Sequence, residues 1–144
     1  MSNTYIPRAL RRSVAERCGY RCSYCQTAQQ VTGAEFTIDH IIPESLGGRT
    51  TENNLCLACW YCNVTKNDRI ASIDLESGLM VHLYNPYTQK WTEHFRWVED
   101  GLVIVGLTPI GRTTVNAVKL NRPSLVISRR LWVAAGWHPP REEA

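Results

Sequence analysis

The chain has 144 residues, of which 44% are hydrophobic and 20% are charged, and its formal net charge is +3. This composition excludes disordered and fibrous proteins, and the length suits a single domain spanning residues 1–144. No apolar run approaches the roughly 20 residues that cross a bilayer, and the first five residues lack the apolar stretch of a signal peptide. We therefore expect a cytoplasmic protein with reduced thiols and no membrane partner.

The six cysteines follow a pattern typical of structural zinc. Four of them form two CxxC pairs: Cys22 with Cys25, and Cys59 with Cys62. Four thiolates from two segments supply the tetrahedral shell that zinc prefers, whereas three disulfides would suit an exported chain. Redox use of the CxxC pairs is a further alternative, but the βαβ pattern that would support it does not precede them. Cys18 and Cys56 break the register and are predicted to be buried small hydrophobes.

The first half of the sequence predicts a helix followed by a compact ββα unit. Residues 7–18 carry apolar side chains every fourth position and begin with a proline, which suits the first turn of a helix. Residues 36–42 are rich in β-branched and apolar types and predict a strand. A returning strand over 54–57 and a short helix from 61 to about 69 complete the unit. We expect this core to span about residues 18–70.

The second half predicts an α+β extension over about residues 79–137. A strand is expected over 79–84, and Glu99-Asp100-Gly101 separates two apolar runs at 95–98 and 102–105, which indicates a hairpin. Two helices are expected, over residues 113–120 and 124–135. Four tryptophans are predicted to fill the core around the ββα unit: Trp91, Trp97, Trp132 and Trp137. Of the histidines here, we interpret His82 and His94 as structural or surface residues and His138 as part of a tail.

Asp39 and His40 lie between the two CxxC pairs, and Asn63 follows the second pair directly. Phosphodiester hydrolysis needs a base for the attacking water and a hard cation on the phosphate. His40 can be the base, while Asp39 and the amide oxygen of Asn63 can bind the cation. Successive side chains on a strand point to opposite faces, so we expect a bulge or bend near Pro43 that turns both residues toward one site. A purely structural Asp-His pair is the alternative.

These residues resemble the HNH endonuclease family, and more narrowly the zinc-knuckled branch of the ββα-metal nucleases. The resemblance covers about residues 18–69 and rests on the following motifs: Asp39 to Pro43, Gly47-Gly48, Thr51, Asn54-Leu55, Cys59 to Asn63, and Lys66. Residues 79 to about 130 are similar to the tails of small stand-alone HNH proteins. The expected fold is therefore α+β, a ββα-metal core with a structural four-cysteine zinc site, extended by a C-terminal hairpin and helices.

The resemblance implies a role for each motif residue. His40 corresponds to the general base, and Asn54, or its neighbour Asn53, to the middle Asn that braces the loop and orients the histidine. Asn63 stands where many members have histidine, which makes this chain an HNN variant. Asp39 and Asn63 would then hold the catalytic metal, and their oxygen ligands favour magnesium or manganese over softer ions. The implied products carry 5′-phosphate and 3′-hydroxyl ends.

The expected partner is DNA. Arginines crowd the first segment and form a second basic spot at Arg129 and Arg130; such clusters suit phosphate contacts, although a solvated helix face is an equal alternative. We take Lys66, three residues after Asn63, and Arg21 as substrate-contact candidates, although an exposed lysine is equally compatible with the pattern. One such site cuts one strand, so double-strand cleavage would need a homodimer or a partner chain. A non-catalytic zinc-knuckle module that binds nucleic acid is the alternative function.

Overall fold

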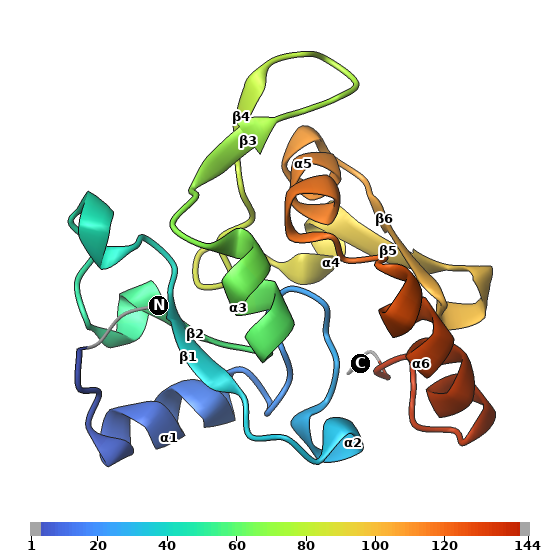
Figure 1. Cartoon of the computed structure of the whole chain (residues 1–144), viewed down its shortest axis with the longest axis horizontal. Coiled ribbons are helices and arrows are strands. Elements are labelled where there is room, and N and C mark those ends of the chain that lie inside the picture. The colour runs from blue at the N-terminus through green and yellow to red at the C-terminus, as the bar shows by residue number, and fades with distance from the viewer. Residues whose placement is uncertain (1–3, 142–144) are drawn as a thin grey trace.

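The computed structural model describes residues 4–141 and has an α+β fold (Figure 1). Its α-helices are α1 (Arg8–Arg17), α2 (Gln29–Thr32), α3 (Trp60–Lys66), α4 (Trp91–His94), α5 (Pro109–Val118) and α6 (Pro123–Ala134). Its strands are β1 (Thr37–His40), β2 (Leu55–Ala58), β3 (Ala71–Ile73), β4 (Met80–His82), β5 (Phe95–Val98) and β6 (Val103–Gly106). The strands form three two-stranded antiparallel sheets, each joining neighbours in sequence.

The predicted ββα unit is formed by β1, β2 and α3. The antiparallel register runs from Thr37 opposite Ala58 to His40 opposite Leu55, and both α1 and α3 contact this ribbon. Val14 of α1 is fully buried and packs with Ile6 and Leu55, which is the apolar face that the four-residue spacing predicted. The ribbon is thus fixed between α1 and α3 (Figure 1).

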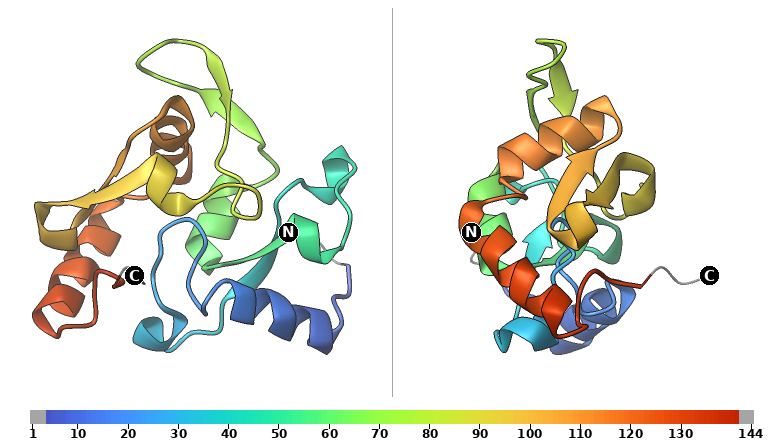
Figure 2. Two further views of the ribbon diagram at one scale, coloured as in Figure 1. Left: turned by 180° about the vertical axis from the view of Figure 1, so that it is seen from behind. Right: turned by 90° about the vertical axis from the view of Figure 1, so that its right-hand side faces the viewer.

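The C-terminal part of the chain contains the other two hairpins and the helices α4, α5 and α6. The β3–β4 hairpin projects from the rest of the chain in all the views of Figures 1 and 2. Helix α5 lies against β6, and two glycines permit this close approach. A Cβ on Gly106 would lie 2.2 Å from the backbone nitrogen of Arg112, and one on Gly111 would lie 1.9 Å from the carbonyl oxygen of His94. Any larger residue at either position would therefore push the helix off the strand.

One cluster of buried side chains joins the two halves of the molecule. It contains Tyr24 and Leu57 from the first half together with Phe95, Ile104 and Leu120 from the second. A hydrogen bond of 3.0 Å also runs from the indole nitrogen of Trp91 to the carbonyl oxygen of Tyr24, between the two cysteines of the first CxxC pair. The extension therefore covers the ββα unit and contacts its first CxxC loop.

Most elements agree with the sequence predictions, but α5 begins earlier than predicted, and the short elements α2, α4 and β3 were not predicted. Helix α5 begins at Pro109 rather than at residue 113, because the hydroxyl of Thr108 accepts a hydrogen bond from the backbone nitrogen of Gly111 (3.0 Å) and caps an earlier turn. Strand β3 was not predicted. It pairs with β4, which is itself shorter than the strand expected over residues 79–84.

Three side-chain predictions in the second half are wrong. Trp137 is 61% exposed and does not fill the core. His138 is buried rather than part of a loose tail: its Nε2 lies 2.9 Å from the carbonyl oxygen of Gly101, and its ring meets that of Trp97 edge-on. Arg129 is fully buried and donates to backbone carbonyls, so it forms no basic spot with Arg130. Burial lowers the pKa of Arg129 to about 10.

The helices of the described residues are all too short or too polar to traverse a bilayer.

Candidate metal centres and cleft

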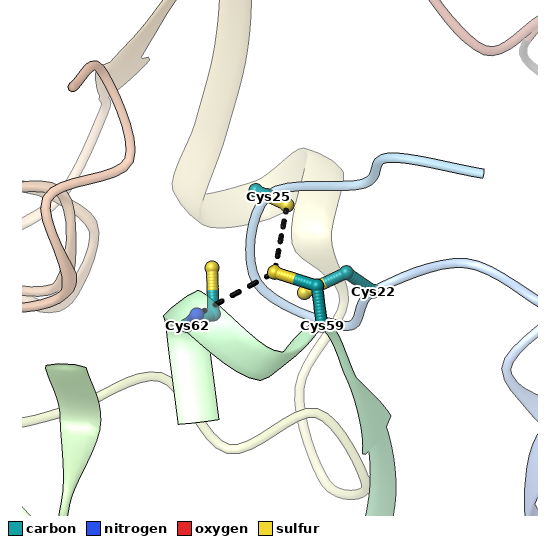
Figure 3. A group of neighbouring side chains, drawn as sticks. All are labelled: Cys22, Cys25, Cys59 and Cys62. Carbon is teal, nitrogen blue, oxygen red and sulfur yellow. Dashed lines mark hydrogen bonds between the residues drawn. The ribbon is translucent and has the colours of Figure 1, made fainter. Parts of the chain in front are cut away.

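The four cysteines of the CxxC pairs converge on one point. Cys22 and Cys25 come from the loop after α1, Cys59 follows β2, and Cys62 lies in the first turn of α3 (Figure 3). Their sulfur atoms all lie within 4.8 Å of one another, and those of Cys25 and Cys59 are 3.9 Å apart. A tetrahedral site with Zn–S bonds of about 2.3 Å separates its sulfurs by about 3.8 Å. The predicted four-cysteine cluster is therefore confirmed, and its geometry fits zinc.

The surroundings of this cluster favour a bound cation. Burial raises the pKa of the Cys22 thiol well above its ordinary value, and four thiolates this close together would repel one another, so all four form only beside a positive charge. Arg122 contributes one such charge: its two terminal nitrogens lie 3.7 Å from the sulfur of Cys62 and 3.9 Å from that of Cys59. The same guanidinium stacks on the ring of Tyr61 at 3.9 Å. Zinc would supply the remaining charge and replace the mutual hydrogen bonds of the thiols.

All six cysteines are free thiols, and the two outside the CxxC pairs lie outside the cluster. Cys56 is fully buried beside Tyr24, and burial raises the pKa of its thiol. The sulfur of Cys18 lies 3.4 Å from the backbone nitrogen of Leu57, from which it accepts a hydrogen bond. The predicted burial is thus confirmed for Cys56, which lies on β2, whereas Cys18 is only half-buried.

Asp39, His40 and Asn63 line one cleft of about 960 Å³. Two come from the end of β1 and the third from the first half of α3. Of the bulge or bend expected near Pro43, the structure has the bend: β1 pairs regularly with β2 through His40, without a bulge, and the chain bends at Ile41 and Ile42, directly before Pro43. The cleft also has Arg11, from α1, in its wall.

Hydrogen bonds fix the orientation of the His40 imidazole. Its Nε2 lies 2.8 Å from the hydroxyl oxygen of Thr50 and 3.3 Å from a carboxylate oxygen of Glu44. The Thr50 hydroxyl in turn donates to that Glu44 oxygen at 3.2 Å. The Glu44 carboxylate can only accept, so the single hydroxyl proton of Thr50 points toward it. The Thr50 oxygen can then only accept from His40, and Nε2 therefore carries the proton. The neutral ring therefore has its lone pair on Nδ1.

Asp39 is buried, and its carboxylate has charged and polar partners. Oδ2 accepts a hydrogen bond of 2.9 Å from the hydroxyl of Tyr24 and lies 3.2 Å from the ammonium of Lys66. Burial raises the pKa of Asp39, and the nearby Lys66 ammonium opposes that rise. The carboxylate also contributes to raising the pKa of Tyr24, whose own burial is the larger cause. Oδ2 is thus held by the protein, and Oδ1 remains for another ligand.

Asn54 has the bracing contacts that the resemblance implies for the middle Asn. Its buried side chain accepts from the backbone nitrogen of Ile42 (2.8 Å) and donates to the carbonyl oxygens of Ile42 (3.0 Å) and Arg49 (2.9 Å). These bonds tie the two ends of the loop between β1 and β2. Asn53 is exposed, and its amide oxygen accepts from the Thr51 hydroxyl within its own turn. The contacts therefore favour Asn54 over Asn53.

The structure does not support the predicted substrate contacts of Lys66 and Arg21. Only 1% of Lys66 is exposed, and its ammonium donates to the carbonyl oxygens of His40 and Ile41 (both 3.2 Å) as well as pairing with Asp39. The Lys66 ammonium is thus paired within the protein and is not exposed to a substrate. Arg21 is partly buried, donates to the carbonyl oxygen of Gln26 (3.3 Å) and does not line the cleft.

The donor atoms at the cleft suit a hard cation. The amide nitrogen of Asn63 donates to the hydroxyl of Thr37 at 3.0 Å, which orients the amide oxygen as the free acceptor. This oxygen and Oδ1 of Asp39 are ligands of the kind that magnesium and manganese prefer. Two protein ligands are enough for magnesium, because it usually keeps several waters and binds substrate phosphate.

Comparison with known families agrees with this geometry. Residues 22–69 match the model of the HNH endonuclease family. The match begins at the first cysteine of the first CxxC pair and extends beyond α3, so it contains all four clustered cysteines and the cleft residues of β1 and α3. The HNH endonuclease match is thus a match of residues 22–69, and the four-cysteine cluster within them is compatible with the zinc-knuckle branch. No curated protein and no solved structure gave a significant match.

Sequence reasoning missed the residues that surround the catalytic candidates. Glu44 and Thr50 lie in the loop between the strands, and Tyr24 lies inside the first CxxC pair. Their contacts depend on how the loop folds back, which local patterns do not reveal. The four-residue spacing of His40 and Glu44 was the one available signal, and it resembles many ordinary polar pairs.

Proposed function

We propose that this protein is a metal-dependent endonuclease that hydrolyses DNA phosphodiester bonds. The observation that carries the proposal is the convergence of Asp39, His40 and Asn63 on one cleft within a domain of the HNH endonuclease family. A zinc-knuckle module that only binds nucleic acid would need none of these three side chains in one cleft. The family match supports nuclease function in general, and the cleft residues are the basis for the specific reaction.

His40 is the general base of the proposed reaction. Its Nε2–H donates to Thr50, and so Nδ1 has the lone pair that can accept the proton of the attacking water. The Thr50–Glu44 arrangement holds this tautomer and stabilises the imidazolium that forms when the proton arrives. Both residues act by positioning His40.

Asp39 and Asn63 hold the catalytic metal, which we propose to be magnesium or manganese. When bound, such an ion polarises the phosphate and offsets the charge that develops on the leaving oxygen.

Lys66 fixes Oδ2 of Asp39 and, through two carbonyl oxygens, the chain that follows the strand. Tyr24, which lies within the first CxxC pair, donates a hydrogen bond to the same carboxylate oxygen. Asn54 holds the loop that carries Glu44 and Thr50. Zinc at the four cysteines stays structural.

Nicking of supercoiled plasmid tests the proposal. We expect magnesium or manganese to start nicking by the wild-type protein, and His40→Ala to reduce the rate by about 10²–10⁴-fold, the usual cost of removing a general base. His82→Ala is the matched control, because this histidine is exposed on β4 and does not line the cleft. The zinc content of each variant is measured in parallel, so that loss of fold is separated from loss of the base.

Two results would count against the assignment. Nicking that persists at the wild-type rate in the His40 variant would remove His40 as the base. DNA binding without nicking under any metal would favour the non-catalytic module. Because one cleft cuts one strand, we propose that double-strand cleavage, if it occurs, uses a second copy of the chain or a partner chain.

A further inference from the structure

A second groove, of about 520 Å³, runs along helix α1. Three arginines of this helix line it, Arg8, Arg11 and Arg12, and two tyrosines, Tyr5 and Tyr20, form part of its wall. The arginines have a spacing of three and four residues, so they lie on one side of the helix. All three are exposed. The groove is therefore lined by exposed positive charges that a ligand within it can contact.

This groove is continuous with the cleft that contains His40. The two share five lining residues: Ile6, Arg11, Glu35, Phe36 and Ile38. Arg11 lines both, whereas Arg8 and Arg12, on either side of it along α1, line only the groove. A chain molecule whose reacting group lies beside His40 would thus continue into the groove.

The positive charge of the groove is mostly uncompensated. Within residues 4–141, none of the three arginines forms an ion pair with a carboxylate, and Glu35 is the one acidic residue in the groove wall. Arg17, five residues beyond Arg12 on α1, differs: it pairs with Glu52 at 2.7 Å and also donates to the carbonyl oxygen of Leu55. Arg17 thus has a structural role, whereas the fold makes no comparable use of the charges on Arg8 and Arg12.

We propose that the α1 groove binds the phosphate backbone of the DNA strand on one side of the scissile phosphate. Arg8 and Arg12 are separated by about 6 Å along the helix axis at 1.5 Å per residue, which approaches the rise of two nucleotides in a strand at about 3.4 Å each. Arginine matches phosphate oxygens with its planar set of donors. This inference rests on the proposed DNA-cleaving function and extends it by assigning a path to the substrate.

The salt dependence of DNA binding tests the groove directly. Binding is measured without catalytic metal in the His40→Ala background, so that no DNA is cut, with duplex and single-stranded oligonucleotides over a range of salt concentrations. The slope of log K against log[salt] is negative, and 'slope' here means its magnitude. Each lost phosphate contact lowers this magnitude by roughly 0.9 on duplex and 0.7 on single strands. We therefore expect R8Q/R11Q/R12Q to lower the duplex slope by roughly 2.7 relative to the same background.

Two further variants guard against indirect effects. Arg11 also donates from Nε to the carbonyl oxygen of Ile6 at 3.1 Å, so R8Q/R12Q keeps this bond and is expected to lower the duplex slope by roughly 1.8. R96Q/R130Q removes the same charge from exposed arginines that line neither the cleft nor the groove, and its slope should match that of the background. Zinc content and circular dichroism check the fold of each variant.

The outcomes separate this inference from the proposed function. A slope that falls in the α1 variants and not in the control, on either oligonucleotide, supports the groove. If the wild-type protein nicks DNA but the α1 variants keep the full slope, or the control loses as much, the groove proposal is overturned and the nuclease assignment stands. A wild-type protein that neither nicks nor binds DNA would instead refute the proposed function.

Discussion

Lys66 ends helix α3 with its ammonium group inside the protein, where it meets the carboxylate of Asp39 and two carbonyl oxygens. Removing water from two such charges is costly, and their attraction offsets that cost only when the geometry and the additional hydrogen bonds are good. Here both groups have further partners, the carbonyl oxygens for Lys66 and the Tyr24 hydroxyl for Asp39. The ion pair is therefore tolerated inside the protein, but replacing only one of its two residues should destabilise the fold, because the other charge would be left buried without a partner.

We predict that Lys66→Met destabilises the protein by about 3–5 kcal/mol, because Asp39 would be left as an uncompensated buried carboxylate. Chemical denaturation of the zinc-loaded protein measures the loss. Lys90→Met, at an exposed position, is the matched control. The double variant D39N/K66M should recover part of the loss, since it also removes the stranded charge. Equal stability of Lys66→Met and wild type would contradict the prediction.

Thr50 offers a test of how His40 is held. We predict that Thr50→Val lowers kcat by roughly 10–100-fold, by analogy with the hydrogen-bond partners that orient metal-binding histidines, and leaves DNA affinity nearly unchanged. The reason is that Nε2 loses its acceptor at 2.8 Å and keeps only the longer contact to Glu44. Single-turnover nicking and binding at low temperature separate the two quantities. A change in affinity with unaltered kcat would assign Thr50 to substrate binding.

At the residue scale, the sequence identified the cleft residues and misjudged one of their neighbours. Asp39, His40 and Asn63 were predicted because their chemistry and spacing are specific to one kind of site. Lys66 was predicted to contact phosphate, because a position about one helical turn beyond Asn63 can face the same cleft, and an exposed lysine was the alternative. Its burial depends on the carboxylate and carbonyls that the β1 end brings to it, and this tertiary arrangement leaves no local signature.

Among the elements, the β3–β4 hairpin depends most on its anchor. A two-stranded hairpin is marginal by itself, and several of its apolar side chains are exposed, including Ile73 and Met80. Asp74, directly after β3, connects it to α5: Oδ2 lies 2.9 Å from a terminal nitrogen of Arg112, and Oδ1 accepts from Nε at 3.3 Å. This ion pair joins the projecting hairpin to the helix that packs on β6.

We predict that Asp74→Asn loosens the hairpin near neutral pH and that this effect disappears in acid. The Arg112 guanidinium lowers the pKa of Asp74 from 3.8 to about 2. A carboxyl with a lowered pKa contributes stability above its unfolded pKa, and loses it as the pH falls through the folded value. The difference in melting temperature between wild type and variant should therefore shrink between about pH 4 and pH 2. A difference that is constant over this window would contradict the role of the charge.

At the element scale, the sequence identified the long helices, the β5–β6 hairpin and the ββα unit, and it missed α2, α4 and β3, each of only three or four residues. Helices α1 and α6 and the β5–β6 hairpin were predicted from their spacing and turn residues. Strand β3 has three residues, Ala71 to Ile73, and no alternating pattern, so only its pairing with β4 defines it. The early start of α5 came from the cap at Thr108, which the search for apolar periodicity overlooked.

For the whole molecule, the four-cysteine cluster joins two segments that lie far apart in the sequence. Cys25 and Cys59, whose sulfurs are in contact, are separated by 34 positions. The buried cluster shared by both halves includes Cys22, Cys25 and Cys62. Folding of the ββα unit and of the extension should therefore be coupled to the metal, because binding energy at a site that forms only on folding contributes to stability.

We predict one tightly bound zinc per chain, and loss of stability when it is removed. A metal that exceeds its dissociation constant about 1,000-fold contributes about 4 kcal/mol, so Cys25→Ser should lower the melting temperature by roughly 10 °C or more. Cys18→Ala is the control, because this thiol lies outside the cluster and should leave one zinc in place. Metal analysis and thermal denaturation check both. A metal-free wild-type protein that melts at the same temperature as the zinc-loaded protein would contradict the prediction.

Helix α3 has only seven residues, and within them Cys62 belongs to the sulfur cluster while Asn63, its neighbour, lines the cleft. A helix this short has little stability of its own in water, so its position depends on whatever holds its first turn. A chelator that extracts the ion from the cysteines would displace Asn63 as well. Inhibition by EDTA would then arise at either centre, and restoring activity with magnesium alone would require that the sulfur site had never been emptied.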